Sequence, residues 1–370
     1  MSKNTLGVGL VGVQPVSSWA ARAHIPALQA MPENFHIAGI ANTSLASAQK
    51  AVEAIGGVGR AFADVGALIA SSEVDVVAVT VKVPHHLELV KAALQAGKHV
   101  YCEWPVGNGL EEAREMAALA RETGLVAVAG TQARVAPAML QVRQLVASGY
   151  VGEVLSTTLI GSGMNWGAVI NQRNAYTLDV ENGASMLTIP FGHTLSAVAD
   201  VLGGVASVSA VLATRRKTVR VVETGEDRPM TSPDQILVAG LLKSGVPISI
   251  HYRGGKPRGN GLLWEIYGTH GEIQVTGNGG HTQFVELAVK GAQGDAAALV
   301  DLPLPAPQGE PHGLDIYGAH VATLYRQLAA DVRDGTRTAP TFDDALQTHR
   351  LIAAIELAAR EGRVVMVEAL

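Results

Sequence analysis

The chain has 370 residues, of which 48% are hydrophobic and 16% are charged, and its net charge is −5. The large apolar fraction excludes wholesale disorder, and the negative charge argues against a surface that binds nucleic acid. A single cysteine excludes a disulfide framework and a cysteine metal cluster. No apolar run of about 18 residues indicates a membrane span, and the amino terminus lacks a signal-peptide pattern. We therefore expect a soluble, cytoplasmic protein.

Strand-like apolar runs alternate with alanine-rich helical stretches at the start of the chain. Continuous apolar strands separated by helices are typical of a parallel sheet that is covered on both faces. We therefore predict a doubly wound, Rossmann-type α/β domain over residues 1–132. Helix 19–31 contains Pro26, near its start or in a break. Strands are predicted at 6–13, 35–42, 74–81, 98–104 and 125–132, and helices at 19–31, 44–56, 64–70, 86–97 and 110–124.

After a helix at 135–148, the pattern changes to strand-like alternation with glycine-containing turns. Only one further helix, at about 183–202, interrupts these strands. Alternating strands of this kind predict a large, mostly antiparallel sheet that is open on at least one face. This second domain is expected to span residues 133–314 and to serve substrate binding and oligomerisation.

Two polar stretches rich in proline and glycine, 223–234 and 291–313, are predicted to be exposed loops. Two helices at about 315–334 and 342–361 end the chain. We expect this last segment, 315–370, to pack back on the body of the protein.

The first predicted strand leads into a turn that is suited to a dinucleotide phosphate. Gly12 supplies the glycine that a tight turn needs, but Gln14 and Ser17 stand where the pattern G-x-G-x-x-G has its other glycines. The hydroxyl groups of Ser17 and Ser18 can bind phosphate or cap the next helix. An ordinary strand–helix turn is the alternative. The expected contacts of the cofactor here are Gly12, Val13, Gln14, Ser17, Ser18 and Trp19.

The second predicted strand ends at Asn42, and Thr43 follows it. In Rossmann folds an acidic residue at this place usually binds the ribose hydroxyls. A neutral side chain also permits the 2′-phosphate of NADP, although no arginine nearby would select it. Asn42 and Thr43 could instead belong to a helix cap. The expected cofactor is therefore NAD or NADP.

Residues 97–105, GKHVYCEWP, resemble the signature A-G-K-H-V-x-x-E-K-P of the Gfo/Idh/MocA family. Further motifs follow in the same order, including F-G-H-T at 191–194 and G-G-K-P at 254–257. Within the family, these motifs most resemble those of the branch of the yeast galactose-pathway repressor. The resemblance covers nearly the whole chain. It implies a Rossmann domain, an antiparallel substrate domain, a bound NAD or NADP, and a homodimer or homotetramer formed through the second-domain sheet.

Two positions depart from the family pattern. Trp104 replaces the catalytic lysine, and its indole N–H can donate a hydrogen bond but cannot act as a base. Ile189 replaces an aspartate that often precedes the family's histidine by four residues. His193 is then the best candidate base, because an ordinary histidine pKa near 6.5 suits proton transfer. It could instead be a buried structural histidine. Tyr176 and Lys256 are the secondary catalytic candidates.

The remaining candidates are binding residues. The resemblance implies that Glu103 lies near the nicotinamide ribose. Other side chains follow strands at the carboxyl edge of the sheet, where doubly wound folds bind ligands. Trp166 offers a ring face to a sugar, or else packs under its own loop. Beyond the turn and Asn42, the expected cofactor contacts are Val81, Lys82, His86, Glu103, Trp104 and Gln132. The expected substrate contacts are Trp104, Asn165, Trp166, Tyr176 and His193.

These features together predict an NAD(P)-dependent oxidoreductase. Its small-molecule substrate would be a secondary alcohol or ketone of a polar ring, such as a sugar or cyclitol. The alternative is a non-catalytic regulator that binds NAD(P). We expect no metal, since the sequence has neither an HExxH motif nor a cysteine pair. We also expect no nucleic-acid or membrane partner.

Overall fold

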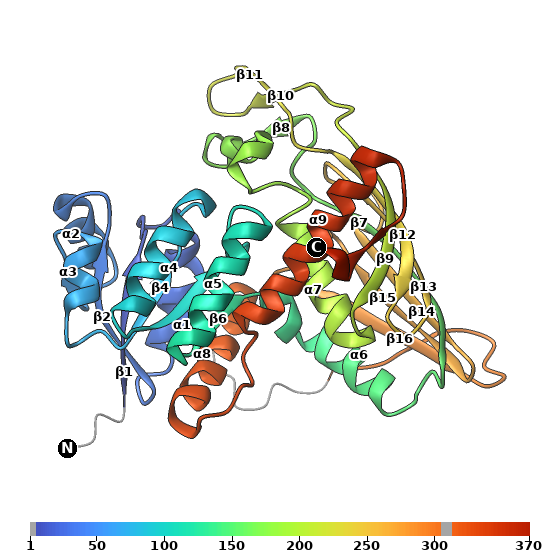
Figure 1. Cartoon of the computed structure of the whole chain (residues 1–370), viewed down its shortest axis with the longest axis horizontal. Coiled ribbons are helices and arrows are strands. Elements are labelled where there is room, and N and C mark those ends of the chain that lie inside the picture. Colours follow the sequence, from blue (N-terminus) through green and yellow to red (C-terminus); the bar gives the residue numbers. More distant parts are fainter. Residues whose placement is uncertain (1–4, 305–312) are drawn as a thin grey trace. The chain divides into compact units, whose positions relative to one another are not determined.

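The computed structural model describes residues 5–304 and 313–370 (Figure 1). The chain divides into two compact units. Unit 1 comprises Met1–Gln132 and Gln308–Leu346, and unit 2 comprises Ala133–Pro307 and Gln347–Leu370. The predicted C-terminal segment 315–370 divides between the units, with residues up to Leu346 in unit 1 and residues from Gln347 onward in unit 2.

Unit 1 is built on a six-stranded parallel sheet with the strand order β3-β2-β1-β4-β5-β6. The order reverses between β1 and β4, which is the point where doubly wound folds bind nucleotides. The predicted Rossmann architecture is thus confirmed. The strands are β1 (Leu6–Val11), β2 (Phe35–Ala41), β3 (Arg60–Ala61), β4 (Val76–Val79), β5 (His99–Glu103) and β6 (Ala127–Gly130). The helices are α1 (Ile25–Gln29), α2 (Leu45–Ala54), α3 (Val65–Ala70), α4 (His86–Gln95), α5 (Leu110–Thr123) and α8 (Ile316–Asp334).

The first predicted helix of unit 1 has two forms. Ala20–His24 is a π-helix, η1, and α1 follows directly with Pro26 in its first turn. His24 lies on η1 and is fully buried. Trp19, just before η1, meets Tyr317 of α8 edge to face with the ring centroids 5.7 Å apart. Helix α8 therefore packs on the segment that follows the turn after β1.

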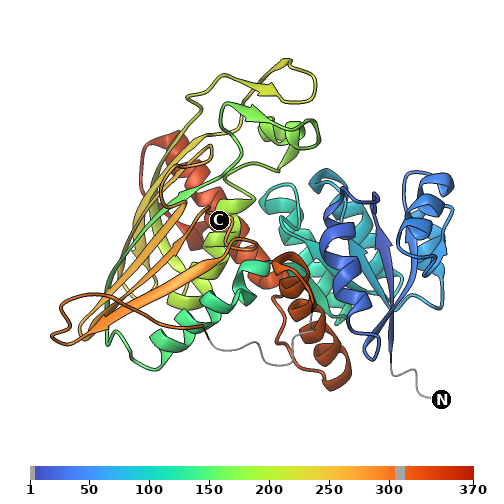
Figure 2. The ribbon, with the colours of Figure 1, turned by 180° about the vertical axis from the view of Figure 1, so that it is seen from behind.

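Unit 2 is built on a nine-stranded sheet with the order β17-β16-β15-β14-β7-β13-β12-β9-β18. Only the β7–β13 pair is parallel among these neighbours, so the predicted mostly antiparallel sheet is confirmed. Helices α6 (Pro137–Ala147) and α7 (Pro190–Leu202) lie over one face, and none of the helices in residues 5–304 and 313–370 covers the other, which we call the bare face (Figure 2). The strands are β7 (Val154–Ser162), β9 (Val205–Ala213), β12 (Gln235–Leu242), β13 (Pro247–Arg253), β14 (Leu262–Gly268), β15 (Gly271–Gly277), β16 (Leu287–Gln293), β17 (Val300–Asp301) and β18 (Val365–Met366).

Some predicted boundaries are wrong. The helix predicted from residue 183 begins only at Pro190, because Gly183 has a φ of +64° and ends a preceding 3-10 turn. The stretch 223–234 is not simply a loop, because it contains β11 (Asp227–Pro229). This strand pairs with β10 (Thr218–Val221), which pairs with β8 (Val169–Ile170) in a small sheet.

The second predicted loop, 291–313, begins with the end of β16 and contains β17, and its residues 305–312 lie outside the described part of the chain. The last helix, α9, spans Phe342–Glu361 as predicted. Within residues 5–304 and 313–370, no helix has both the length and the apolar character needed to cross a membrane.

Candidate functional site

The turn after β1 depends on Gly12. Its φ is +96°, and a Cβ at this position would lie only 2.6 Å from Cγ1 of Val81, which follows β4. Only glycine therefore allows the turn to lie directly against the end of β4 at the reversal point of the sheet. A turn of this kind suits the approach of a phosphate group to the backbone.

A compact loop replaces the usual glycine-rich sequence after Gly12. The Ser18 hydroxyl donates to the Gln14 carbonyl at 2.9 Å and accepts the N–H groups of Gln14 at 3.0 Å and Ala21 at 3.2 Å. Ser18 therefore braces the loop, while Ser17 is exposed. Val16 is 95% exposed and has a φ of +64°, a left-handed conformation that strains a β-branched residue.

Asn42 closes the same turn from the end of β2. Its Oδ1 accepts the Val13 N–H at 2.9 Å, and its Nδ2 donates to the Val13 carbonyl at 2.8 Å. Both polar atoms of the amide are thus engaged by the loop. Thr43 is exposed, and Ser44 caps α2 by accepting the N–H of Ser47. Asn42 therefore has a structural role at the place where ribose binding was expected.

Glu103 ends β5 at the carboxyl edge of the sheet and belongs to a buried hydrogen-bond cluster. Its Oε1 lies 2.7 Å from Nε2 of His24, and both of its carboxylate oxygens accept from Nε2 of Gln132 at 2.9 Å. On the other side, Nδ1 of His24 lies 2.9 Å from the Tyr325 hydroxyl of α8. The structure thus unites two expected residues, Glu103 and Gln132, with two that sequence reasoning missed.

His86 braces the loops beside this cluster. Its Nδ1 lies 2.9 Å from the Pro105 carbonyl oxygen and its Nε2 lies 3.0 Å from the Val81 carbonyl oxygen. Burial lowers the pKa of His86, so the neutral ring can donate to only one of these oxygens. Lys82 is exposed, whereas Trp104 is 5% exposed.

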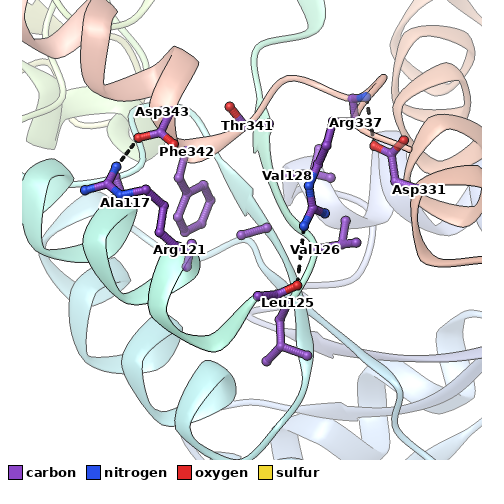
Figure 3. Close-up of a pocket in the computed structure, with 14 residues that line it drawn as sticks. Ala117, Arg121, Leu125, Val126, Val128, Asp331, Arg337, Thr341, Phe342 and Asp343 are labelled. Carbon is purple, nitrogen blue, oxygen red and sulfur yellow. Dashed lines mark hydrogen bonds and ion pairs between the residues drawn. The ribbon is translucent and has the colours of Figure 1, made fainter. Parts of the chain in front are cut away.

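A cavity of about 260 Å³ opens in unit 1 at the other end of β6 (Figure 3). It is lined by residues 125–128, which lead into that strand, and by the ion pair between Arg121 and Asp343. Residues that follow the strands, such as Glu103, lie at the opposite edge of the sheet. The cavity is therefore distinct from the nucleotide residues.

The candidate substrate residues of unit 2 include two buried imidazoles. His193 lies in the first turns of α7, and burial, with a smaller contribution from His281, lowers the pKa of His193 to about 3. The pKa of His193 is therefore not near 6.5, as was expected. So weak a base cannot efficiently remove a proton from an alcohol. Burial likewise lowers the pKa of His281 to about 4, and its Nε2 lies 2.6 Å from the Gly163 carbonyl oxygen. The sequence analysis missed His281, although the glycines before it in G-G-H-T at 279–282 mark a close approach of backbone.

The chain excursion after β7 packs against the G-G-K-P turn. The Gly255 N–H donates to the Asn165 carbonyl at 2.7 Å, and a Cβ on Gly254 would lie 2.3 Å from the Trp166 carbonyl oxygen. The two glycines therefore serve the contact between these turns. Lys256, next to them, is exposed on this turn.

Trp166 is 2% exposed, and its indole N–H donates to the Thr177 carbonyl at 3.0 Å. One face of the indole stacks on His281, with the centroids 6.5 Å apart. The ring thus packs under its own loop. Tyr176 is half-buried on the 3-10 helix η4 (Gln172–Leu178), and burial raises its pKa, so that its phenol stays protonated at neutral pH. In the described ranges, no group of three or more histidine, cysteine or acidic side chains could hold a metal ion.

Comparisons with known proteins agree with this division of the chain. Residues 6–131 match the model of an oxidoreductase family with an NAD-binding Rossmann fold, and residues 137–277 match the model of the Gal80p C-terminal domain. The galactose/lactose metabolism regulatory protein GAL80 of Kluyveromyces lactis is 27% identical over 78% of this chain, which spans 66% of that protein's length. Dehydrogenase aclE of Aspergillus oryzae is 31% identical over a region that covers 75% of this chain and 78% of aclE. A levoglucosan dehydrogenase in complex with NADH and levoglucosan shares the fold, with a TM-score of 0.82, 22% identity and coverage of 98% of this chain and 99% of that one.

Proposed function

The chain belongs to the Gfo/Idh/MocA family of NAD-binding oxidoreductases, and from this membership we propose that it is an NAD(P)-dependent oxidoreductase. The substrate we propose is a secondary alcohol or ketone of a polar ring, such as a sugar or cyclitol. Relatives named dehydrogenase, with aclE at 31% identity, support this class of reaction.

The observation that carries the proposal is the acceptor site at the carboxyl edge of the unit 1 sheet. The Glu103 carboxylate is held there on two sides, and the Oε1 atom of Gln132 is buried without a hydrogen-bond partner among the described residues. Buried polar atoms are normally paired, so this acceptor fits a bound ligand that donates to it. Together with the Gly12 turn, these residues fit NAD(P): the turn would hold its phosphates, and Glu103 and Gln132 would hold a ribose.

The bound nicotinamide would supply or accept the hydride. The proton must then come from the protein or from water. Tyr176 is protonated at neutral pH and can protonate a developing alkoxide, because an alkoxide is a much stronger base than a phenolate. His193 is neutral and can offer a ring nitrogen as a hydrogen-bond partner.

A non-catalytic NAD(P)-binding regulator is the second candidate. Trp104 and Ile189 occupy the positions of the family's catalytic lysine and aspartate, and the low pKa of His193 removes the remaining base. The similarity to GAL80 regulatory proteins supports this reading.

Two measurements separate the candidates. The protein is first titrated with NADH and NADPH while nicotinamide fluorescence is followed. It is then assayed with ring ketones and polyols by nicotinamide absorbance. If the protein is the proposed enzyme, turnover is observed and falls about 100-fold or more in Tyr176→Phe. Tyr267→Phe, a change at a partly exposed tyrosine of β14, should keep full activity.

Binding of a dinucleotide without turnover over the whole panel would instead establish the regulator. In that case Trp104→Lys tests whether the missing lysine alone accounts for the lost catalysis. Absence of binding to both dinucleotides would refute both candidates.

We also propose that the bare face of the unit 2 sheet joins copies of the chain into a homodimer or homotetramer. The strand registers place Ile160, His251, Leu237 and Val211 in one row across β7, β13, β12 and β9. Ile160, Leu237 and Val211 are 40%, 41% and 58% exposed. An exposed row in which three of four side chains are apolar is typical of a contact surface.

A further inference from the structure

The buried cluster at Glu103 extends further than a nucleotide contact requires. It links four elements of unit 1: the π-helix η1, strand β5, the turn after β6 and helix α8. The members at its far end, His24 and Tyr325, are both fully buried. They also contact each other and Tyr101 through their ring edges and faces, with centroids 4.9 to 5.6 Å apart. Their rings are therefore fixed by packing as well as by hydrogen bonds.

The proton positions in this cluster follow from its partners. Burial raises the pKa of Tyr325 well above its ordinary value, so the phenol keeps its proton and must donate it. The acceptor available to it is Nδ1 of His24, at 2.9 Å. With Nδ1 accepting from Tyr325, the His24 ring has its N–H at Nε2 and donates it to Glu103 Oε1 at 2.7 Å. Both ring nitrogens of His24 then have a hydrogen-bond partner.

The π-helix explains how His24 reaches this place. A π-turn inserts one extra residue into a helix and re-aims the side chains around it, and such turns are frequent at functional sites. Here the turn carries His24 from the segment just after the nucleotide loop into contact with Glu103, two strands away in the sheet order. The π-turn therefore serves to orient the Glu103 carboxylate.

Glu103 has a second support in Gln132. The amide nitrogen of Gln132 donates to both carboxylate oxygens, while its Oε1 has no partner in the described residues. Because the two atoms belong to one planar amide, the open acceptor lies beside the carboxylate. The site thus presents two adjacent acceptors, which match the two neighbouring hydroxyl groups of a ribose.

We propose that His24 is a positioning residue, which with Tyr325 behind it fixes the Glu103 carboxylate so that Glu103 and Gln132 together accept the hydroxyl pair of the second ribose of a bound dinucleotide. This inference rests on the proposed binding of NAD(P). We assign the second ribose to this site because β5 and β6 lie in the half of the sheet beyond the reversal point. The first nucleoside binds the other half, which contains β1 and β2.

The test compares two variants of His24. In His24→Gln the amide keeps a donor at the position of Nε2, whereas His24→Met has similar bulk and no donor. Affinity for whichever dinucleotide the wild type binds, in its reduced form, is measured by fluorescence, and affinity for AMP, which lacks the second ribose, by calorimetry. We expect His24→Met to weaken dinucleotide binding about tenfold or more, His24→Gln to restore most of it, and AMP binding to be unchanged in both.

A double-mutant cycle with Glu103→Gln separates positioning from general destabilisation. If His24 acts through Glu103, the loss caused by His24→Met largely disappears once Glu103 is changed. His99→Gln is the matched control, because His99 begins the strand that Glu103 ends. It should leave both affinities unchanged.

The outcomes are distinguishable. Equal dinucleotide affinity in wild type and His24→Met, equal losses in the Met and Gln variants, or additive effects in the cycle would each overturn the positioning role alone. A wild type that binds neither dinucleotide would overturn the proposed function, and this inference with it.

Discussion

Asn42 holds the nucleotide turn with both atoms of its amide, so its replacement by aspartate should weaken the turn. The Oδ1 bond to the Val13 N–H survives in Asn42→Asp, but the second carboxylate oxygen then faces the Val13 carbonyl oxygen, 2.8 Å from the present Nδ2. Two acceptors at that distance repel each other. We expect a loss of about 1–3 kcal/mol in the free energy of unfolding, measured by urea denaturation.

Asn171→Asp provides the matched control. Asn171 caps a 3-10 helix by accepting one N–H through Oδ1, a role that aspartate fills equally well. This variant should be nearly neutral. Equal stabilities of Asn42→Asp and the wild type would show that the pair of bonds to Val13 does not hold the turn.

At the residue scale, the sequence predicted where the site residues lie better than it predicted their protonation states. Gln132 could be placed at the carboxyl edge because it follows a predicted strand there, whereas the place of Glu103 came from the family resemblance. The pKa of His193 could not be predicted, because it depends on burial by segments that are distant along the chain. His24 was missed for a similar reason: its partners Glu103 and Tyr325 are 79 and 301 residues away.

At the scale of elements, Asp331 organises the segment that follows α8. Its carboxylate accepts the N–H groups of Thr338 at 2.8 Å and Ala339 at 2.9 Å, and the hydroxyl groups of Thr336 at 2.7 Å and Thr338 at 3.0 Å. Burial alone would raise the pKa of Asp331, but these bonds lower it below its ordinary value. The ordered segment then covers the edge strand β6, where the Ala129 N–H donates to the Pro340 carbonyl at 2.8 Å.

Asp331→Asn should therefore destabilise unit 1. The new amide group turns a donor toward groups that are themselves donors, so at least one buried backbone N–H loses its acceptor. We expect a loss of about 2–3 kcal/mol in the free energy of unfolding, together with faster hydrogen exchange at Ala129. Asp334→Asn, at the exposed end of the same helix, is the control. Similar effects of the two variants would contradict this account of Asp331.

The elements themselves were mostly predictable, because hydrophobic periodicity reflects which faces are buried. The exceptions are segments whose shape depends on contacts rather than on pattern. The π-helix η1 shows no sequence signal beyond Pro26 after it. The short strand β11 has every residue exposed, so no apolar alternation marks it.

At the scale of the whole molecule, the bare sheet face makes assembly testable. Leu237→Asp places a charge in the middle of the apolar row and should shift the protein toward monomers, because burying an unpaired carboxylate is unfavourable. Sedimentation velocity measures the shift. Val222→Asp changes a valine that is 62% exposed but lies beside the small sheet, and it should leave the assembly intact. A monomeric wild type, or equal effects of both variants, would refute the proposed surface.

The change of pattern near residue 132 follows the end of the last Rossmann strand, β6. Nothing in the periodicity of the last two helices indicates which unit each one joins. That depends on tertiary contacts such as that between Tyr325 and His24.

Unit 2 carries three buried neutral histidines, which should make the protein sensitive to acid. Burial lowers the pKa of His193 and of His349 to about 3 and that of His281 to about 4. In the unfolded chain each would titrate near 6.5, so below that pH the unfolded state binds protons that the folded state does not. Stability is therefore complete above about pH 6.5 and falls as the pH is lowered, by about 1.4 kcal/mol per pH unit for each histidine.

Between about pH 7 and about pH 5, each of these histidines should cost about 2 kcal/mol in the free energy of unfolding. Replacing one of them removes its share of the pH dependence, whatever the replacement does to stability at neutral pH. We expect the decrease measured by urea denaturation to be about 2 kcal/mol smaller in His349→Gln than in the wild type. His36→Gln, at an exposed histidine of β2, should leave the decrease unchanged. An equal decrease in wild type and His349→Gln would mean that His349 takes up its proton in the folded protein as readily as in the unfolded chain.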